Sequence, residues 1–344
     1  MSLKRRRFVL ALAALIASGC GGQNAASSSA AAAAPAAAPS PTNAVGTIER
    51  LDPALDALVA PGAAIEKVAG GFQFTEGPLW RPDQTLWFSD VPGNVIRSLA
   101  PDGTVKVLIN NAGGASTAPP GSFIGPNGMA EAPDGSVWLA QHGDRQIVRI
   151  GPDLTLTPIV SKFEGKRFNS PNDLVFAKDG ALYFTDPPYG LAKQDDDPAK
   201  ELRFNGVYRF ANGRVDALVR DLNRPNGLAF SPDFKQLYVN NSDAAKNLVM
   251  RYDVAADGRI SGGRVFADLT SKIDGLADGL KVDARGNVYT TGPGGIWILS
   301  PEGKHLGKIR PPENPANCGW GDDGKTLYMT AVTGIYRVKT LVGK

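Results

Sequence analysis

The sequence has few of the residues that build thiolate metal sites, disulfide frameworks or cysteine nucleophiles. It contains two cysteines, Cys20 and Cys318, and two histidines among 344 residues. A disulfide scaffold and a zinc site of the Cys/His type are therefore not expected. Long apolar runs are also scarce. The N-terminal run over residues 8–17 has ten residues, whereas a transmembrane helix needs about 20.

The sequence has no large excess of charge of either sign. It has 37 Lys and Arg residues against 34 Asp and Glu residues. Four of the basic residues lie at positions 4–7, in a segment that we expect to be removed, which leaves 37 − 4 = 33 basic residues. Since the remainder is almost neutral and no basic stripe stands out, we expect no nucleic-acid partner.

The N-terminus has the order of a secretory signal, with basic residues, an apolar run and then small residues. We expect residues 1–20 to be a signal peptide. Its type is that of a lipoprotein signal, because Ala17-Ser18-Gly19-Cys20 resembles a bacterial lipoprotein box. Cys20 would then be lipidated, and it would be the chain's one link to a membrane. Arg5-Arg6-Arg7-Phe8 also resembles a twin-arginine signal, so the export route stays open. Either route predicts an exported, periplasmic protein.

Residues 21–46 are dominated by Ala, Ser and Pro. Such a stretch has too little bulky apolar surface to offset the entropy of ordering, so it predicts a flexible tether. The remaining residues, 47–344, are expected to form the globular domain.

A repeat runs through this domain. Six segments share a polar residue at the start of a short apolar run, followed by a turn and a second run rich in β-branched and aromatic residues. The shared position holds Glu76, Asn127, Asn172, Asn226, Asp278 and Asn317. About four short strands in each repeat of roughly 40–50 residues are typical of propeller blades. We therefore predict an all-β, six-bladed β-propeller of four-stranded antiparallel blades. Residues 64–68 are expected to close the ring as an N-terminal strand of the last blade.

The inner strands of a propeller line its central channel, so the six shared positions are expected to face a common centre. Asn and Asp also suit the turn that enters a strand, but such a turn has no need of Glu76. Two carboxylates with several amide oxygens form a hard-oxygen site. It suits Ca²⁺, with Mg²⁺, Mn²⁺ or Zn²⁺ as alternatives.

At these positions the chain resembles the SMP-30/gluconolactonase/LRE-like family, and the bacterial gluconolactonase-like branch in particular. The resemblance rests on Phe74-Thr75-Glu76-Gly77-Pro78, Ser170-Pro171-Asn172-Asp173, Tyr183-Phe184-Thr185-Asp186-Pro187-Pro188-Tyr189-Gly190, Arg224-Pro225-Asn226-Gly227 and Ala277-Asp278-Gly279. It implies a divalent cation held by Glu76, Asn226 and Asp278, with Asn172 completing the site. It also implies hydrolysis of a small lactone, with Asp278 and Asn172 in catalytic roles. Animal members carry an Arg where this chain has Ser170, so sugar recognition by that residue is not carried over.

Four further residues are predicted to contact the substrate. Asn127 shares the ring position, and His142 lies in the loop that follows the second strand of the second blade. Asp186 and Tyr189 belong to a proline-rich loop at one end of the third blade. The alternative to a lactonase is a non-catalytic propeller that binds a ligand or protein and holds a structural calcium ion.

Overall fold

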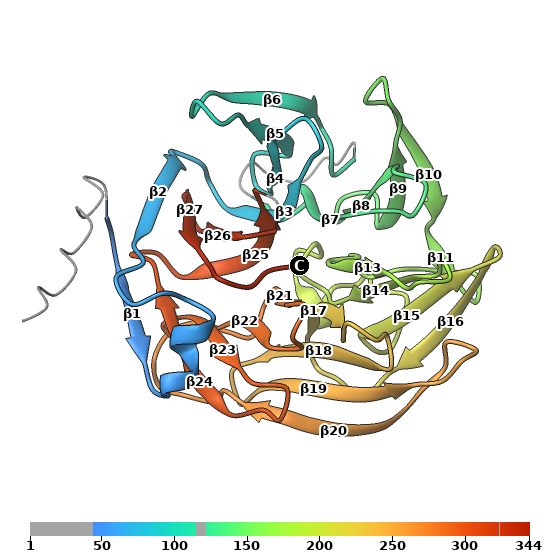
Figure 1. Ribbon diagram of the computed structural model, residues 1–344. Coiled ribbons are helices and arrows are strands. Elements are labelled where there is room, and N and C mark those ends of the chain that lie inside the picture. Colours follow the sequence, from blue (N-terminus) through green and yellow to red (C-terminus); the bar gives the residue numbers. More distant parts are fainter. Residues whose placement is uncertain (1–43, 115–121, 323) are drawn as a thin grey trace, which may run out of the picture. The chain divides into compact units, whose positions relative to one another are not determined.

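The computed structural model describes residues 44–114, 122–322 and 324–344. Six antiparallel blades follow one another around a common axis (Figure 1). The predicted all-β, six-bladed propeller is therefore confirmed. The proposed signal peptide, most of the tether and the proposed lipidation site at Cys20 lie outside the described residues. No helix among the described residues is long and apolar enough to span a membrane.

In the first four blades the strands run from the inside outwards in chain order. The first blade contains β3 (Thr75–Trp80), β4 (Leu86–Asp90), β5 (Val95–Leu99) and β6 (Val105–Asn110). The second contains β7 (Pro126–Glu131), β8 (Val137–Gln141), β9 (Gln146–Ile150) and β10 (Leu156–Val160). The third contains β13 (Leu174–Phe176), β14 (Leu182–Asp186), β15 (Gly206–Ala211) and β16 (Arg214–Val219). The fourth contains β17 (Pro225–Phe230), β18 (Gln236–Asp243), β19 (Lys246–Val254) and β20 (Ile260–Asp268).

The fifth blade contains β21 (Leu280–Val282), β22 (Val288–Gly292), β23 (Gly295–Leu299) and β24 (His305–Arg310). The sixth contains β25 (Pro315–Gly321), β26 (Thr326–Ala331) and β27 (Gly334–Lys339). Its fourth strand is β2 (Ile65–Gly70), which pairs antiparallel with β27. An N-terminal strand thus closes the ring, as predicted, about one to two residues later in the sequence than expected.

Glu313 joins the closing strand to the rest of the sixth blade. Its carboxylate accepts hydrogen bonds from the backbone and hydroxyl of Thr333, both at 2.7 Å, and from the hydroxyl of Tyr336. Lys67 on β2 donates to the same carboxylate at 3.0 Å. One acidic side chain therefore connects the two ends of the domain sequence.

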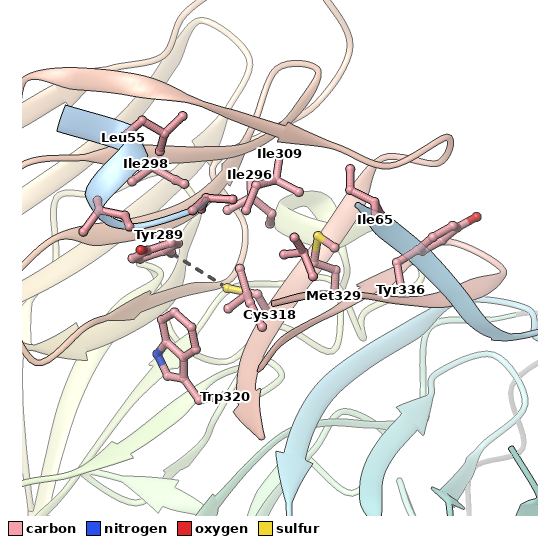
Figure 2. Close-up of a cluster of buried hydrophobic side chains, with 14 of the residues drawn as sticks. Leu55, Ile65, Tyr289, Ile296, Ile298, Ile309, Cys318, Trp320, Met329 and Tyr336 are labelled. Atoms are coloured by element: carbon pink, nitrogen blue, oxygen red, sulfur yellow. Dashed lines mark hydrogen bonds between the residues drawn. The ribbon is translucent and has the colours of Figure 1, made fainter. Parts of the chain in front are cut away.

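A hydrophobic cluster fills the space where the fifth and sixth blades meet (Figure 2). It includes Ile65 of β2, Ile296 of β23 and Met329 of β26, all buried. Cys318 lies in the same cluster, where its Sγ atom contacts the backbone carbonyl of Tyr289 at 3.8 Å. Burial raises the pKa of the Cys318 thiol to about 12. This cysteine is therefore a packing residue of the ring closure.

The structure adds elements that the repeat did not predict. The strand β1 (Thr47–Arg50) pairs with β24 as a fifth strand of the fifth blade. A 3₁₀ helix, η1 (Pro53–Ala57), follows it and buries Leu55 in the closure cluster. A short hairpin, β11 (Lys162–Phe163) and β12 (Lys166–Arg167), and a second 3₁₀ turn, η2 (Gln194–Asp196), lie in loops. Residues 44–46, assigned to the tether above, already contact the propeller, because the Val45 N–H donates to the Ile65 carbonyl at 2.8 Å.

Candidate active site

The shared repeat position lies at or just before the inner strand of every blade. Glu76, Asn127, Asn226 and Asn317 are within β3, β7, β17 and β25, while Asn172 and Asp278 immediately precede β13 and β21. Five of these six side chains line one cavity of about 250 Å³. They are Glu76, Asn127, Asn172, Asn226 and Asp278. All four residues predicted as metal ligands are therefore brought together from four different blades.

Glycine follows the shared residue in several blades because neighbouring inner strands approach very closely there. The N–H of Gly227 donates to the carbonyl of Asp278 at 2.9 Å, and the N–H of Gly128 donates to that of Asn172 at 2.8 Å. A Cβ atom on Gly227 would lie 2.3 Å from that Asp278 oxygen. Gly77, with φ +52°, also needs the freedom of glycine. These contacts fix the backbone positions of the cavity residues.

Hydrogen bonds orient the Glu76 carboxylate. Its Oε2 atom accepts from the Gly77 N–H at 2.8 Å and from Nδ2 of Asn317 at 3.0 Å. The Oδ1 atom of Asn317 in turn accepts from the Cys318 N–H at 2.9 Å. Asn317 is thus a support for Glu76 and does not line the cavity itself.

Two asparagine side chains that line the cavity have amide oxygens that accept no hydrogen bond from the described residues. Nδ2 of Asn226 donates to Oγ of Ser242 at 3.0 Å. Among the described residues, Oδ1 of Asn226 and Oδ1 of Asn127 are buried and have no hydrogen-bond partner. A buried carbonyl oxygen without a partner costs about 1–3 kcal/mol. Both residues line the cavity, so a ligand there could supply the missing interaction.

Negative charge is concentrated around the cavity. Burial raises the pKa of Glu76 to about 7, against its two hydrogen bonds, and the nearby Asp173 carboxylate raises it further. Burial also raises the pKa of Asp278, with the Glu76 and Asp173 charges adding to the effect. The Lys281 ammonium group lowers the pKa of Glu76.

This donor set fits a hard divalent cation. It offers two carboxylates and several asparagine oxygens, two of which have no hydrogen-bond partner among the described residues. Among the residues that the structure describes, no group of three or more His, Cys, Asp or Glu side chains is placed to hold a metal ion. A site here would therefore depend on the asparagine amides as well as on Glu76 and Asp278.

His142 lines the same cavity and is 1% exposed. Its Nδ1 atom lies 3.0 Å from the carbonyl oxygen of Phe123, and its Nε2 atom is buried and has no partner in the part of the chain that the structure describes. Burial lowers the pKa of the His142 imidazole to about 4, so the ring is neutral at pH 7.

Tyr189 also lines the cavity, whereas Asp186 does not. Burial raises the pKa of the Tyr189 hydroxyl, and the charge of Asp278 adds to this. Asp186 is fully buried, and its carboxylate accepts the backbone N–H groups of Asn169 and Ser170, both at 2.8 Å. Asp186 therefore supports the backbone just before Asn172. It does not line the cavity in which the substrate contact was expected.

The one hydroxyl donor of Ser170 is already used within the protein. Its hydroxyl donates to the Pro187 carbonyl at 2.6 Å and accepts from the Gly190 N–H at 2.9 Å. The side chain is fully buried. Ser170 therefore links the segment before Asn172 to the proline-rich loop that contains Pro187 and Gly190.

Sequence reasoning missed the residues that form the apolar part of the cavity. Phe74, Phe123 and Leu276 line it together with Gln194 and Ser242. The rings of Phe74 and Phe123 pack edge to face, with centroids 5.1 Å apart. Phe74 and Leu276 each lie two residues before the shared repeat position, an offset that could have revealed them, whereas Phe123 and Gln194 lie in loops outside the repeat. The cavity is therefore lined by polar side chains together with aromatic and aliphatic ones.

Comparisons with known proteins agree with this geometry. Residues 74–333 match the model of the SMP-30/Gluconolactonase/LRE-like region. A gluconolactonase of Zymomonas mobilis is 40% identical over 308 residues, which cover 86% of each chain. A 6-deoxy-6-sulfogluconolactonase of Pseudomonas putida is 26% identical, covering 74% of this chain and 82% of the relative. The structure of a gluconolactonase from Xanthomonas campestris superimposes with a TM-score of 0.76 at 30% identity, covering 88% of this chain and 99% of that one. The chain belongs to the SMP-30/gluconolactonase/LRE-like family.

Proposed function

We propose that this protein is a divalent-metal-dependent hydrolase that opens a sugar lactone or another small lactone. The observation that carries the proposal is the convergence of Glu76, Asn172, Asn226 and Asp278 in one cavity. Gluconolactonases that share most of the chain's length support the choice of a lactone as substrate. A cavity of about 250 Å³ is of a size that suits a small cyclic ester.

Glu76, Asn172, Asn226 and Asp278 would hold the cation, with Ca²⁺ as the first choice and Zn²⁺, Mg²⁺ or Mn²⁺ as alternatives. The chemistry that such a cation supplies is stabilisation of the negative charge that develops on a carbonyl oxygen. The oxygen of a water molecule forms the new bond to the carbonyl carbon and the bond to the ring oxygen breaks. The ring oxygen takes up the proton that the water loses, so a hydroxy acid results. Asp278 is partly exposed to the cavity, so its carboxylate can accept the proton that the water loses.

The remaining polar groups would position the lactone. Asn127, His142 and Tyr189 line the cavity beside the proposed ligands. Asn172 acts as ligand and as a contact to the reacting carbonyl. The aromatic wall of Phe74 and Phe123 excludes water from one side of the substrate.

A lactone panel read by a pH indicator tests the proposal. The wild-type protein should hydrolyse at least one small lactone, and prior treatment with a chelator should abolish the rate. Glu76→Gln and Asp278→Asn should each lower kcat/KM by at least about 100-fold, as expected for the loss of a charged group at the reacting centre. Asp253→Asn is a matched control, because this exposed aspartate pairs with Arg264 on an outer part of the fourth blade. Wild-type rates in both cavity variants would contradict the proposal.

The second candidate is a non-catalytic propeller that binds a ligand or protein and keeps a structural Ca²⁺. The same experiment separates the two. That alternative predicts no lactone hydrolysis by the wild-type protein, together with a fall in thermal stability after chelation.

We further propose that the protein acts in the periplasm of a bacterium, held to the membrane by a lipid on Cys20. The support is the sequence order of basic, apolar and small residues before Cys20. Cys20→Ala should release the protein from the membrane fraction into the soluble periplasmic fraction. Equal distribution of both forms would argue against the lipid anchor.

A further inference from the structure

His142 is fixed by the backbone on both sides of a narrow turn. It follows β8, and its N–H donates to the Gly125 carbonyl at 3.2 Å. The next residue, Gly143, donates to the Ile124 carbonyl at 2.9 Å. A Cβ atom on Gly190 would lie 2.8 Å from Cβ of His142, so the proline-rich loop packs against the same side chain. The imidazole is therefore held in one place.

The neighbouring backbone also determines which ring nitrogen carries the proton. Nδ1 of His142 lies 3.0 Å from the carbonyl oxygen of Phe123. A carbonyl oxygen can only accept a hydrogen bond, so Nδ1 must be the protonated nitrogen. In the neutral ring Nε2 then has a lone pair and no proton.

This Nε2 atom is buried and has no partner among the described residues. His142 itself is 1% exposed and lines the cavity with Asn127 and Asn172. A buried acceptor without a donor is destabilising unless a water or a ligand supplies the hydrogen bond, and this one lines a cavity that a ligand can enter. The complementary ligand group is a hydrogen-bond donor.

We propose that Nε2 of His142 accepts a hydrogen bond from a hydroxyl group of the substrate, so that the cavity selects polyhydroxylated lactones over lactones without hydroxyl groups. This inference rests on the proposed lactonase function and narrows its substrate class. It also explains how a polar substrate can be recognised although the Ser170 hydroxyl is buried and bonded to Pro187 and Gly190. His142 is here a specificity residue, with no proton transfer assigned to it.

Two substitutions separate the two ring nitrogens. In His142→Asn the shorter amide can keep a donor near the Phe123 carbonyl but places nothing at Nε2. In His142→Gln the longer amide can return an oxygen to the position of Nε2. His305→Asn is the control, because this second histidine stacks on Trp297 in the outer part of the fifth blade.

The kinetic test compares D-glucono-δ-lactone with δ-valerolactone, which has no hydroxyl groups. His142→Asn should raise KM for the gluconolactone about 5- to 10-fold, the usual effect of one lost hydrogen bond, with little change in kcat. KM for δ-valerolactone should rise much less, because this lactone has no hydroxyl group that could bond to Nε2, and His142→Gln should recover part of the loss for the gluconolactone. Equal effects on both substrates, a change confined to kcat, or no effect on either would overturn the inference.

A measurement without turnover keeps the inference testable if the lactonase proposal fails. The chain has only two histidines, so long-range ¹H–¹⁵N spectra of the full chain resolve both rings. His142 should show a proton on Nδ1 and none on Nε2. Addition of D-sorbitol, a polyol that cannot be hydrolysed, should shift Nε2 of His142 and leave His305 unchanged. A proton on Nε2, or no response to sorbitol, would refute the inference whether or not any lactone is cleaved.

Discussion

The close approach of inner strands makes Gly227→Ala an informative perturbation of both the fold and the site. The added Cβ would lie 2.3 Å from the Asp278 carbonyl oxygen, 2.7 Å from Cα of Gly279 and 2.8 Å from the Leu280 nitrogen. All three atoms belong to the backbone, so no flexible side chain can move aside. Real Cβ contacts essentially never fall below 3.0 Å. The fifth blade must therefore shift by at least 3.0 − 2.3 = 0.7 Å at Asp278.

The cost of this shift has two parts. Overpacking a well-ordered interior costs about 1–3 kcal/mol. The 2.9 Å hydrogen bond from the Gly227 N–H to the Asp278 carbonyl would be stretched, at a cost of about 0.5–1.5 kcal/mol. We expect the free energy of unfolding to fall by about 2–4 kcal/mol in total. Since displacement of a reacting group by about 1 Å can cost about 100-fold in rate, lactone kcat/KM should fall by about tenfold or more.

Urea unfolding and lactone hydrolysis measure the two effects on the same preparations. Gly70→Ala is the matched control, because its Cβ would meet the Cε atom of Lys67 at 2.9 Å, at the far end of a flexible side chain. The control should lie within about 0.5 kcal/mol of the wild type. A Gly227→Ala protein as stable and as active as the control would refute the account of these glycines.

Three further predictions follow from single side chains. Asn317→Ala removes the 3.0 Å hydrogen bond to Glu76, so kcat/KM for lactone should fall by about tenfold while the variant stays folded by circular dichroism. Asp186→Asn cannot accept both backbone N–H groups beneath the Asn172 loop, so thermal unfolding should show a loss of about 1–3 kcal/mol and the rate should also fall; an unchanged melting temperature would contradict this role. Although burial alone would raise the pKa of Glu313, hydrogen bonds from Tyr336, Thr333 and Lys67 lower it to about 2, below the ordinary value of 4.5 for a glutamate. Its contribution is therefore present above about pH 4.5 and is lost as the pH falls towards 2, so acid should destabilise the wild type more steeply than Glu313→Gln.

The sequence predicted best the polar residues that the repeat places at one level of the central channel. Each blade carries one polar residue at the same offset, so the sequence alone predicts that Glu76, Asn172, Asn226 and Asp278 lie together around the central channel. Closure by an N-terminal strand also followed, because the last repeat has one strand too few.

Other features of the site depend on contacts that the spacing of residues in the sequence does not reveal. Asn317 shares the repeat position, yet its amide group donates a hydrogen bond to Glu76 and does not line the cavity. Asp186 looked like a loop group for the substrate, but burial beneath Asn169 and Ser170 gives it backbone partners. The aromatic wall of Phe123 comes from a loop outside the repeat.

Calcium binding to metal-stripped protein, measured by isothermal titration calorimetry, tests the central claim most directly. The claim is that carboxylates and amides from four blades hold one divalent cation. The wild type should bind one strongly held Ca²⁺ per chain at neutral pH, and Glu76→Gln and Asp278→Asn should each weaken that binding by at least about tenfold. Absence of binding by the wild type, or undiminished binding by both variants, would contradict the account.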